Sequence, residues 1–201
     1  MKFVDLFAGL GGFHKALSEL GHECVFASEI DPELQNLYRL NFPEPKDLVH
    51  GDITKSIDLV PEHDILVAGF PCQPFSKSGY QWGREDTKNG TLFSYVLEVA
   101  GKFRPSFVIL ENVGNFERHD KDRTWAIVRQ SLEEIGYSVA GMEHIASGGS
   151  GLISPHHLGF PHQRERREQL VAHDFESAQN KYDWSVVVEM FESLYLELAS
   201  D

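Results

Sequence analysis

The first thirty residues constrain the fold most strongly, because they read as a strand, a glycine-rich turn, a helix and a second strand. An apolar strand is predicted over residues 2–7, interrupted only by Asp5, and a tight turn over residues 8–12. A helix follows over residues 13–20, and a second strand over residues 24–28. This order is typical of a nucleoside-binding unit built on a parallel sheet.

An acid stands at the end of the second predicted strand. Glu29 follows the glycine turn by about twenty residues, where a carboxylate can accept hydrogen bonds from ribose hydroxyls. The turn reads GxGG, with Gly9, Gly11 and Gly12, and lacks the third glycine of a dinucleotide site. This spacing favours a ligand without a pyrophosphate, such as an adenosyl amino acid. For the glycines alone, a simple tight turn is the alternative.

A second helix and a third acid follow. Asp31 and Pro32 suit the first turn of a helix that extends to about Leu40. Asp52 comes at another probable strand end, where its side chain can accept a hydrogen bond from an adenine amino group while Ile53 packs against the ring. A turn or helix-cap role is the alternative for Asp52.

A cysteine lies on a stiff loop just past a buried strand. The apolar run 64–68 predicts the strand, and residues 69–76 read Gly-Phe-Pro-Cys-Gln-Pro-Phe-Ser. The flanking prolines restrict the backbone, so the Cys72 thiol is aimed in one direction at the carboxyl edge of the sheet. An inert buried cysteine is the alternative. The polar segment 78–86 is expected to form a mobile loop long enough to close over a site.

The next strand brings a carboxyl group to the same edge. A helix is predicted over residues 92–103 and a buried strand over residues 107–110, with Glu111 at its carboxyl end. A helix over 125–135 and a strand over 137–146 follow. Glu111 alone would read as a solvated acid or a helix cap, but beside a cysteine loop it favours a functional role.

The only dense basic cluster lies in residues 160–167. A solvated face is its usual interpretation. On an extended segment, however, Arg164 and Arg166 would point to one side, where they could hold a carboxylate or phosphate.

Composition limits the partners of the chain. With 201 residues, 41% of them hydrophobic, one core and a single domain are expected. Two cysteines outside any CxxC pair favour a reducing cytoplasm, and we expect no signal peptide, membrane span or metal site. The net charge of −13 argues against this chain gripping a phosphate backbone by itself.

These segments together resemble the DNA (cytosine-5) methyltransferases. The resemblance covers roughly residues 2–172 and rests on four ordered motifs: Asp5 to Phe13 (DLFAGLGGF), Gly69 to Ser76 (GFPCQPFS), Glu111 to Val113 (ENV) and Gln163 to Arg166 (QRER). One departure is that His162 directly follows the proline of the last motif, where the family usually has glutamine, so that Gln163 is shifted by one.

The resemblance implies a three-layer α/β, Rossmann-like S-adenosylmethionine-dependent methyltransferase fold. Its sheet would be mostly parallel, with one reversed strand near residues 137–146 and 169–172. Residues 1–172 would form the cofactor-binding and catalytic domain. Residues 173–201 would form an acidic tail, helical over 183–198.

The resemblance also implies the site. Cys72 would attack C6 of cytosine, Glu111 would engage N3, and Arg166 or Arg164 would hold O2 and orient Glu111. S-adenosylmethionine would be the methyl donor and S-adenosylhomocysteine the product. The expected cofactor contacts are Phe7, Ala8, Gly9, Gly11, Gly12, Phe13, Glu29, Ile30, Asp52, Ile53 and Pro71.

The expected partners are DNA and a second protein. After Arg167 nothing resembles the family's target-recognition region or its closing motif, so a second subunit is expected to supply both, in a restriction-modification setting. Cofactor binding to this chain alone is then expected to be weak. The alternatives are a truncated enzyme, an inactive cofactor-binding chain, or a related enzyme acting on RNA.

Overall fold

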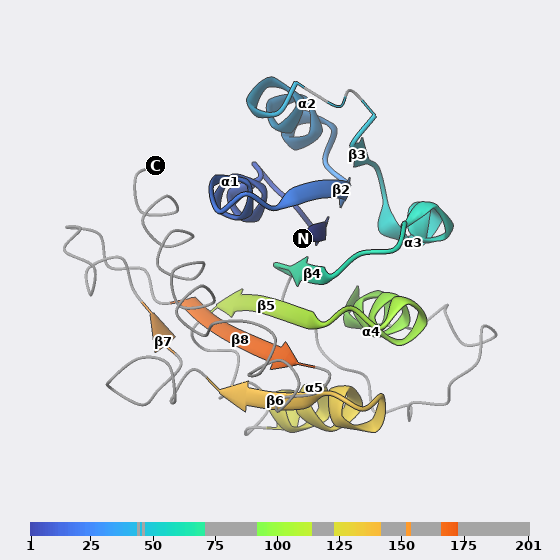
Figure 1. Ribbon diagram of the computed structural model, residues 1–201, viewed down its shortest axis with the longest axis vertical. Helices are drawn as coiled ribbons and strands as arrows, with labels where there is room; N and C mark the ends of the chain where they lie inside the picture. The colour runs from blue at the N-terminus through green and yellow to red at the C-terminus, as the bar shows by residue number, and fades with distance from the viewer. Residues whose placement is uncertain are drawn as a thin grey trace.

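The computed structural model describes residues 1–70 except 44 and 46, and residues 92–113, 123–141, 152–153 and 166–172. Within these residues, the strands form one sheet in the order β3-β2-β1-β4-β5-β8-β6, with β7 paired to β8 (Figure 1). The strands are β1 (Lys2–Leu6), β2 (Glu23–Ser28), β3 (Val49–His50), β4 (Ile65–Ala68), β5 (Phe107–Val113), β6 (Ser138–Gly141), β7 (Leu152–Ile153) and β8 (Arg166–Ala172).

Neighbouring strands from β3 through β5 are parallel, and β8 is antiparallel to β5, β6 and β7. The mostly parallel sheet with one reversed strand is therefore confirmed, and the reversed strand is β8. Because β6 pairs antiparallel to β8, it runs in the same direction as β5.

Helices cover both faces of the sheet. They are α1 (Gly12–Glu19), α2 (Pro32–Asn41), α3 (Ile53–Ser56), α4 (Leu92–Phe103) and α5 (Arg123–Glu134), with a 3-10 turn at Ile57–Leu59. In Figure 1, α1 and α2 lie on one side of the strands and α3 and α4 on the other. The three-layer α/β architecture expected from the sequence is confirmed.

Alternating side chains of the strands build two cores. Phe3 faces α1 and α2, where it packs with Leu17 and Tyr38. Its neighbour Val4 faces the opposite layer, where Phe93 of α4 packs. All five of these side chains are buried. Burial on both faces explains the near-continuous apolar runs of the central strands.

The helix starts follow from their capping residues. The side chain of Asp31 accepts hydrogen bonds from the backbone N–H groups of Glu33 (2.8 Å) and Leu34 (3.4 Å), and Pro32 occupies the first turn of α2. α1 instead begins after Gly11, whose φ of +90° needs a glycine. The predicted starts of both helices hold to within one residue.

One element is longer than the sequence suggested. We expected the strand 107–110 to end before Glu111, but β5 continues to Val113. The register explains the extension, because Ala68, the last residue of β4, pairs with Leu110, while Glu111, Asn112 and Val113 pair with β8. The reversed strand thus supplies main-chain partners beyond the end of β4. Within the described ranges, no helix is long and apolar enough to cross a membrane.

Candidate active site

The carboxyl ends of the parallel strands gather the candidate residues at one edge of the sheet. The glycine turn follows β1, Glu29 follows β2, Asp52 follows β3 and Gly69 follows β4. Open α/β sheets bind ligands at this edge.

The turn after β1 holds its backbone in left-handed conformations at three positions. Phe7 has a φ of 62°, Gly9 of 56° and Gly11 of 90°. The Ala8 N–H donates to the carbonyl of Ser28 at 2.9 Å, which joins the turn to the end of β2. A positive φ is unusual for an aromatic residue and occurs where the surrounding structure imposes it. Nothing in the sequence predicted the positive φ of Phe7.

Glu29 clamps this turn to the start of α2. One oxygen of its carboxylate, Oε2, accepts from the Gly9 N–H at 2.9 Å, and the other, Oε1, accepts from the Asp31 N–H at 2.9 Å. Its own N–H donates to the carbonyl of His50 at 3.1 Å. Each carboxylate oxygen has a second lone pair, so the side chain can still accept hydrogen bonds from a diol.

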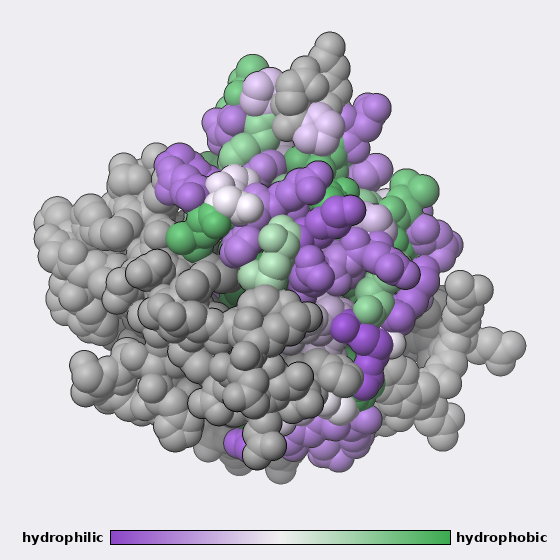
Figure 2. All heavy atoms as spheres, in the orientation of Figure 1, coloured by the Kyte–Doolittle hydropathy of each residue, from purple (hydrophilic) through white to green (hydrophobic). Residues whose placement is uncertain are grey.

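Open space lies next to this carboxylate. A Cβ atom built on Gly9 would meet nothing within 4 Å, so a ligand can approach the backbone there. Ile30, the residue after Glu29, is 69% exposed. Among the coloured residues in Figure 2, hydrophilic ones predominate and hydrophobic ones appear only in scattered patches. An exposed Ile30 beside a buried acid suits the adenosine half of a nucleoside ligand.

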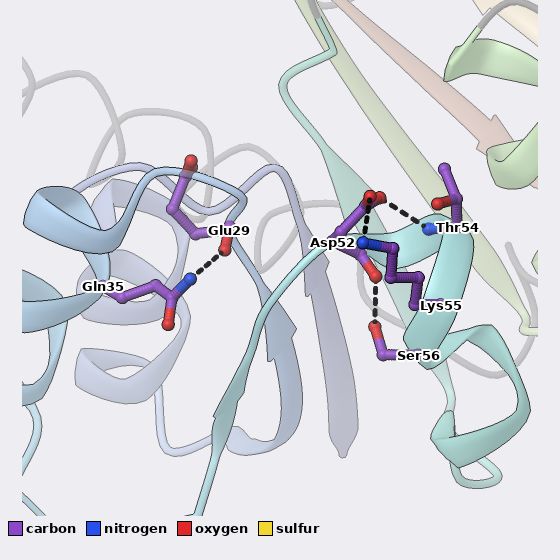
Figure 3. Close-up of polar contacts among 6 residues, drawn as sticks. All are labelled: Glu29, Gln35, Asp52, Thr54, Lys55 and Ser56. Carbon is purple, nitrogen blue, oxygen red and sulfur yellow. Dashed lines mark hydrogen bonds and ion pairs between the residues drawn. The ribbon is translucent and has the colours of Figure 1, made fainter.

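Asp52 serves as a helix cap in this structure. Its side chain accepts a hydrogen bond from the Thr54 N–H at 3.0 Å, and Lys55 Nζ lies 4.0 Å from Oδ2 (Figure 3). The local role that the sequence left open is thus present, and contact with adenine stays a prediction. Ile53 is 3% exposed and packs in the core beneath Asp52. Its contact with a ring stays a prediction as well.

Glu111 approaches the end of β4. A Cβ atom built on Gly69 would lie 3.4 Å from Glu111 Oε2 and 3.9 Å from Phe13 Cε2. The glutamate, the strand end that leads to Cys72 and the first turn of α1 therefore meet in space. Cys72 and Pro71 themselves lie outside the described residues.

Of the two candidate arginines, the structure describes only Arg166. Arg166 begins β8, and its backbone pairs with that of Val113, two residues beyond Glu111. The segment therefore reaches the strand that carries the glutamate, and contact between the Arg166 side chain and Glu111 stays a prediction. Arg164, together with the segments 78–86 and 173–201, lies outside the described residues.

A buried polar cluster lies beneath the turn and was not predicted from the sequence. The ring nitrogen Nδ1 of His14 lies 2.6 Å from the Tyr38 hydroxyl, and Cys24 Sγ lies 3.8 Å from the same hydroxyl. Asp5 is fully buried, and among the described residues no hydrogen bond of normal geometry reaches its carboxyl oxygens. The one available signal was an acid inside an apolar strand.

Burial controls the protonation of this cluster. It raises the pKa of Asp5 well above its ordinary value, and the nearby charge of Glu29 adds to the effect. It also lowers the pKa of His14 to about 4 and raises that of the Cys24 thiol. Cys24 is therefore an inert core residue. Among the residues that the structure describes, no group of three or more His, Cys, Asp or Glu could hold a metal ion.

Solved structures match the fold. The crystal structure of S. pombe Dnmt2 methyltransferase aligns with a TM-score of 0.63 and 23% identity, covering 87% of this chain and 50% of that one. This likeness shows that the chain shares its overall fold with that structure.

Sequence comparisons identify the family. The family model for C-5 cytosine-specific DNA methylases matches residues 1–188. Type II methyltransferase M.HhaI of Haemophilus parahaemolyticus is 41% identical over 167 residues, which cover 83% of this chain and 47% of that protein. Type II methyltransferase M1.ScrFI of Lactococcus lactis subsp. cremoris is 40% identical over 190 residues, which cover 92% of this chain and 44% of that protein. The chain thus spans about half the length of these relatives, and it belongs to the C-5 cytosine-specific DNA methylase family.

Proposed function

We propose that this chain binds S-adenosylmethionine and supplies the catalytic groups that transfer its methyl group to C5 of cytosine in DNA. The observation that carries the proposal is the meeting of Glu111, Gly69 and Phe13 at the sheet edge that also holds the clamped Glu29. One end of this edge suits an adenosine. The other brings a carboxyl group to the strand that leads into Cys72.

The residues fit the methyl donor. The two carboxylate oxygens of Glu29 would accept from the ribose hydroxyls, and Ile30 would cover one face of the adenine. The open backbone at Gly9 would admit the amino-acid part. When bound, the donor supplies an electrophilic methyl group on a sulfonium sulfur.

The chain's own groups would prepare cytosine to accept that methyl group. The Cys72 thiolate adds to C6 while the Glu111 carboxyl donates a proton or hydrogen bond to N3, which makes C5 nucleophilic. Arg166 or Arg164 would hold O2 of the base. Once C5 carries the methyl group, a base would remove the C5 proton, the Cys72–C6 bond would break, and any proton that N3 had taken would return to Glu111, which restores the ring. The cytosine must leave the duplex stack to reach Cys72.

Target recognition belongs to a second polypeptide in this proposal. The net charge of −13, with 18 basic and 31 acidic residues, supports it, because phosphate contacts require Lys and Arg. An acidic surface would help to recruit a basic partner. A restriction-modification role, a cytoplasmic location, a domain boundary after residue 172 and a helical acidic tail are further parts of the proposal.

The test is a covalent trap. Duplex DNA carrying 5-fluorocytosine in many sequence contexts is mixed with S-adenosylmethionine and the chain, alone and with a candidate recognition subunit, and adducts are mapped by mass spectrometry. Fluorine cannot leave as a cation, so we expect an adduct on Cys72. Cys24→Ala is the matched control, because it removes the buried thiol and should leave the adduct intact.

Four results separate the alternatives. An adduct that needs the second polypeptide supports the complete proposal, while an adduct formed by the chain alone removes the second subunit from it. An adduct on fluorinated RNA and none on DNA would change the substrate. An adduct that persists in Cys72→Ala, or none under any condition, contradicts the catalytic role.

A further inference from the structure

Gln35 lies close to both loops that carry the candidate cofactor acids. Its side-chain Nε2 donates a hydrogen bond to the main-chain carbonyl of Glu29 at 2.8 Å (Figure 3). A Cβ atom built on Gly51, the residue before Asp52, would lie 3.9 Å from the same nitrogen. The amide thus bonds to the end of β2 and lies close to the loop that follows β3.

Arg39 extends this contact one helical turn along α2. Its Nη2 lies 3.2 Å from Gln35 Oε1 and 3.3 Å from the carbonyl of Val49 in β3. The helix therefore holds both strand ends through two side chains four residues apart. We define Gln35 and Arg39 together as the α2 strap.

The strap continues the sheet where main-chain pairing stops. Strands β2 and β3 pair from Ala27 to Ser28, and the bond from the Glu29 N–H to His50 completes the ladder. Past that point, the segment after β2 leads into α2 and the segment after β3 leads into α3. Gln35 satisfies the Glu29 carbonyl at this divergence, where a buried acceptor would otherwise lose its hydrogen bond.

We propose that Gln35, supported by Arg39, is a positioning residue that sets the distance between Glu29 and Asp52 and thereby the affinity for the adenosine half of the cofactor. The proposal rests on the proposed function, since it assigns those two acids to one ligand. Arg39 is exposed, so its hydrogen bonds compete with water. We therefore expect Arg39 to contribute less than Gln35 to the positioning of the two acids.

Two substitutions test the α2 strap. Gln35→Glu keeps the size of the side chain and its pairing with Arg39, but it removes the donor to the Glu29 carbonyl. Gln35→Ala removes both contacts. Asn36→Ala is the matched control, because Asn36 is an exposed neighbour on the same helix. Binding of S-adenosylhomocysteine and of 5′-methylthioadenosine, which lacks the amino-acid part, is measured by calorimetry.

We expect about tenfold weaker binding of both ligands to the two Gln35 variants, by the same factor for each ligand, and a smaller loss for Arg39→Ala. A lower melting temperature with unchanged binding of both ligands would overturn the positioning role and leave a purely structural one. Weaker binding of S-adenosylhomocysteine alone, with unchanged binding of 5′-methylthioadenosine, would also overturn the positioning role. The substitution would then affect contacts with the amino-acid part of the ligand and not with its adenosine half. Absence of binding in the unmodified chain would instead contradict the proposed function together with this role.

Discussion

The side-chain amide of Asn112 donates a 2.9 Å hydrogen bond to the main-chain carbonyl of Phe70. Both residues are buried, and the bond joins β5 to the end of β4 across 42 residues of sequence. Phe70 directly precedes the Pro-Cys dipeptide. The middle residue of the Glu-Asn-Val motif therefore fixes the backbone from which the segment with the candidate nucleophile Cys72 departs.

Replacing this amide should cost stability. Asn112→Ala removes the buried side-chain donor to the Phe70 carbonyl, so we expect a loss of about 1–3 kcal/mol in the free energy of unfolding. Urea denaturation measures it. Asn41→Ala is the control, since Asn41 donates to the Leu10 carbonyl at 3.1 Å from an exposed position. Equal losses for the two variants would show that burial of the Phe70 contact adds nothing.

Replacing two glycines of the turn by alanine should lower thermal stability by different amounts. A methyl group on Gly11 would overlap the Phe42 ring and approach Tyr38 Cε2 to 3.0 Å, whereas one on Gly9 meets nothing within 4 Å. Both have positive φ, which costs a side chain about 1–2 kcal/mol, and overpacking at Gly11 adds about 1–3 kcal/mol. We therefore expect the greater fall in thermal stability for Gly11→Ala. Recovery in Gly11→Ala with Phe42→Leu would confirm the clash, and a greater loss for Gly9→Ala would contradict it.

The buried Asp5 should make stability depend on pH. Its pKa is raised in the folded state, so folding takes up a proton above the ordinary pKa of 3.8, and the wild-type chain loses stability as the pH rises from about 4. Asp5→Asn removes this titration. We expect its advantage over the wild type to grow between pH 4 and pH 8 by about 1 kcal/mol or more, given that a tenfold change in an equilibrium is worth about 1.4 kcal/mol.

Urea titrations at several pH values measure this difference, with Glu62→Gln at an exposed position as the control. An advantage of Asp5→Asn that stays constant with pH would show that the carboxyl does not titrate differently in the folded state.

Glu29→Gln should weaken both the turn and the ligand site. An amide of the same size offers one acceptor oxygen, so one of the two backbone N–H groups of Gly9 and Asp31 would face a donor instead. We expect a loss of about 1.5–3 kcal/mol in unfolding free energy and at least tenfold weaker binding of S-adenosylhomocysteine. Chemical denaturation and calorimetry measure the two effects.

Glu33→Gln is the control for charge removal alone. It lies in the first turn of α2, where an exposed acid contributes about 0.3–1 kcal/mol. If both variants bind the ligand equally well, Glu29 does not contact it.

The central strands and helices could be predicted because they follow strong local rules. Two examples are the apolar run at residues 65–68 and the Asp31 cap, which can be recognised from neighbouring residues alone. Each predicts an element whose observed bounds lie within a residue or two of the expected ones. The positions of Glu29 and Glu111 at one edge followed from parallel pairing alone.

What the sequence did not reveal depends on contacts between distant segments. The extension of β5 to Val113 requires β8 as a partner, and the positive φ of Phe7 is imposed by its surroundings. Likewise, the cluster of Asp5, His14 and Tyr38 forms only when β1, α1 and α2 pack together. Of these features, only the Asp5 cluster leaves a local sign, an acid inside an apolar strand, and that sign does not reveal the partners.

The pairing of β5 with β8 has a consequence for biosynthesis. Residues 107–113 leave the ribosome well before residues 166–172, and at about 5–20 residues per second the interval lasts a few seconds. During that time, a largely apolar strand edge has no partner and can pair with another nascent chain. We therefore expect ribosome-bound chains stalled between these two segments to need chaperones, and those stalled beyond β8 to need them far less.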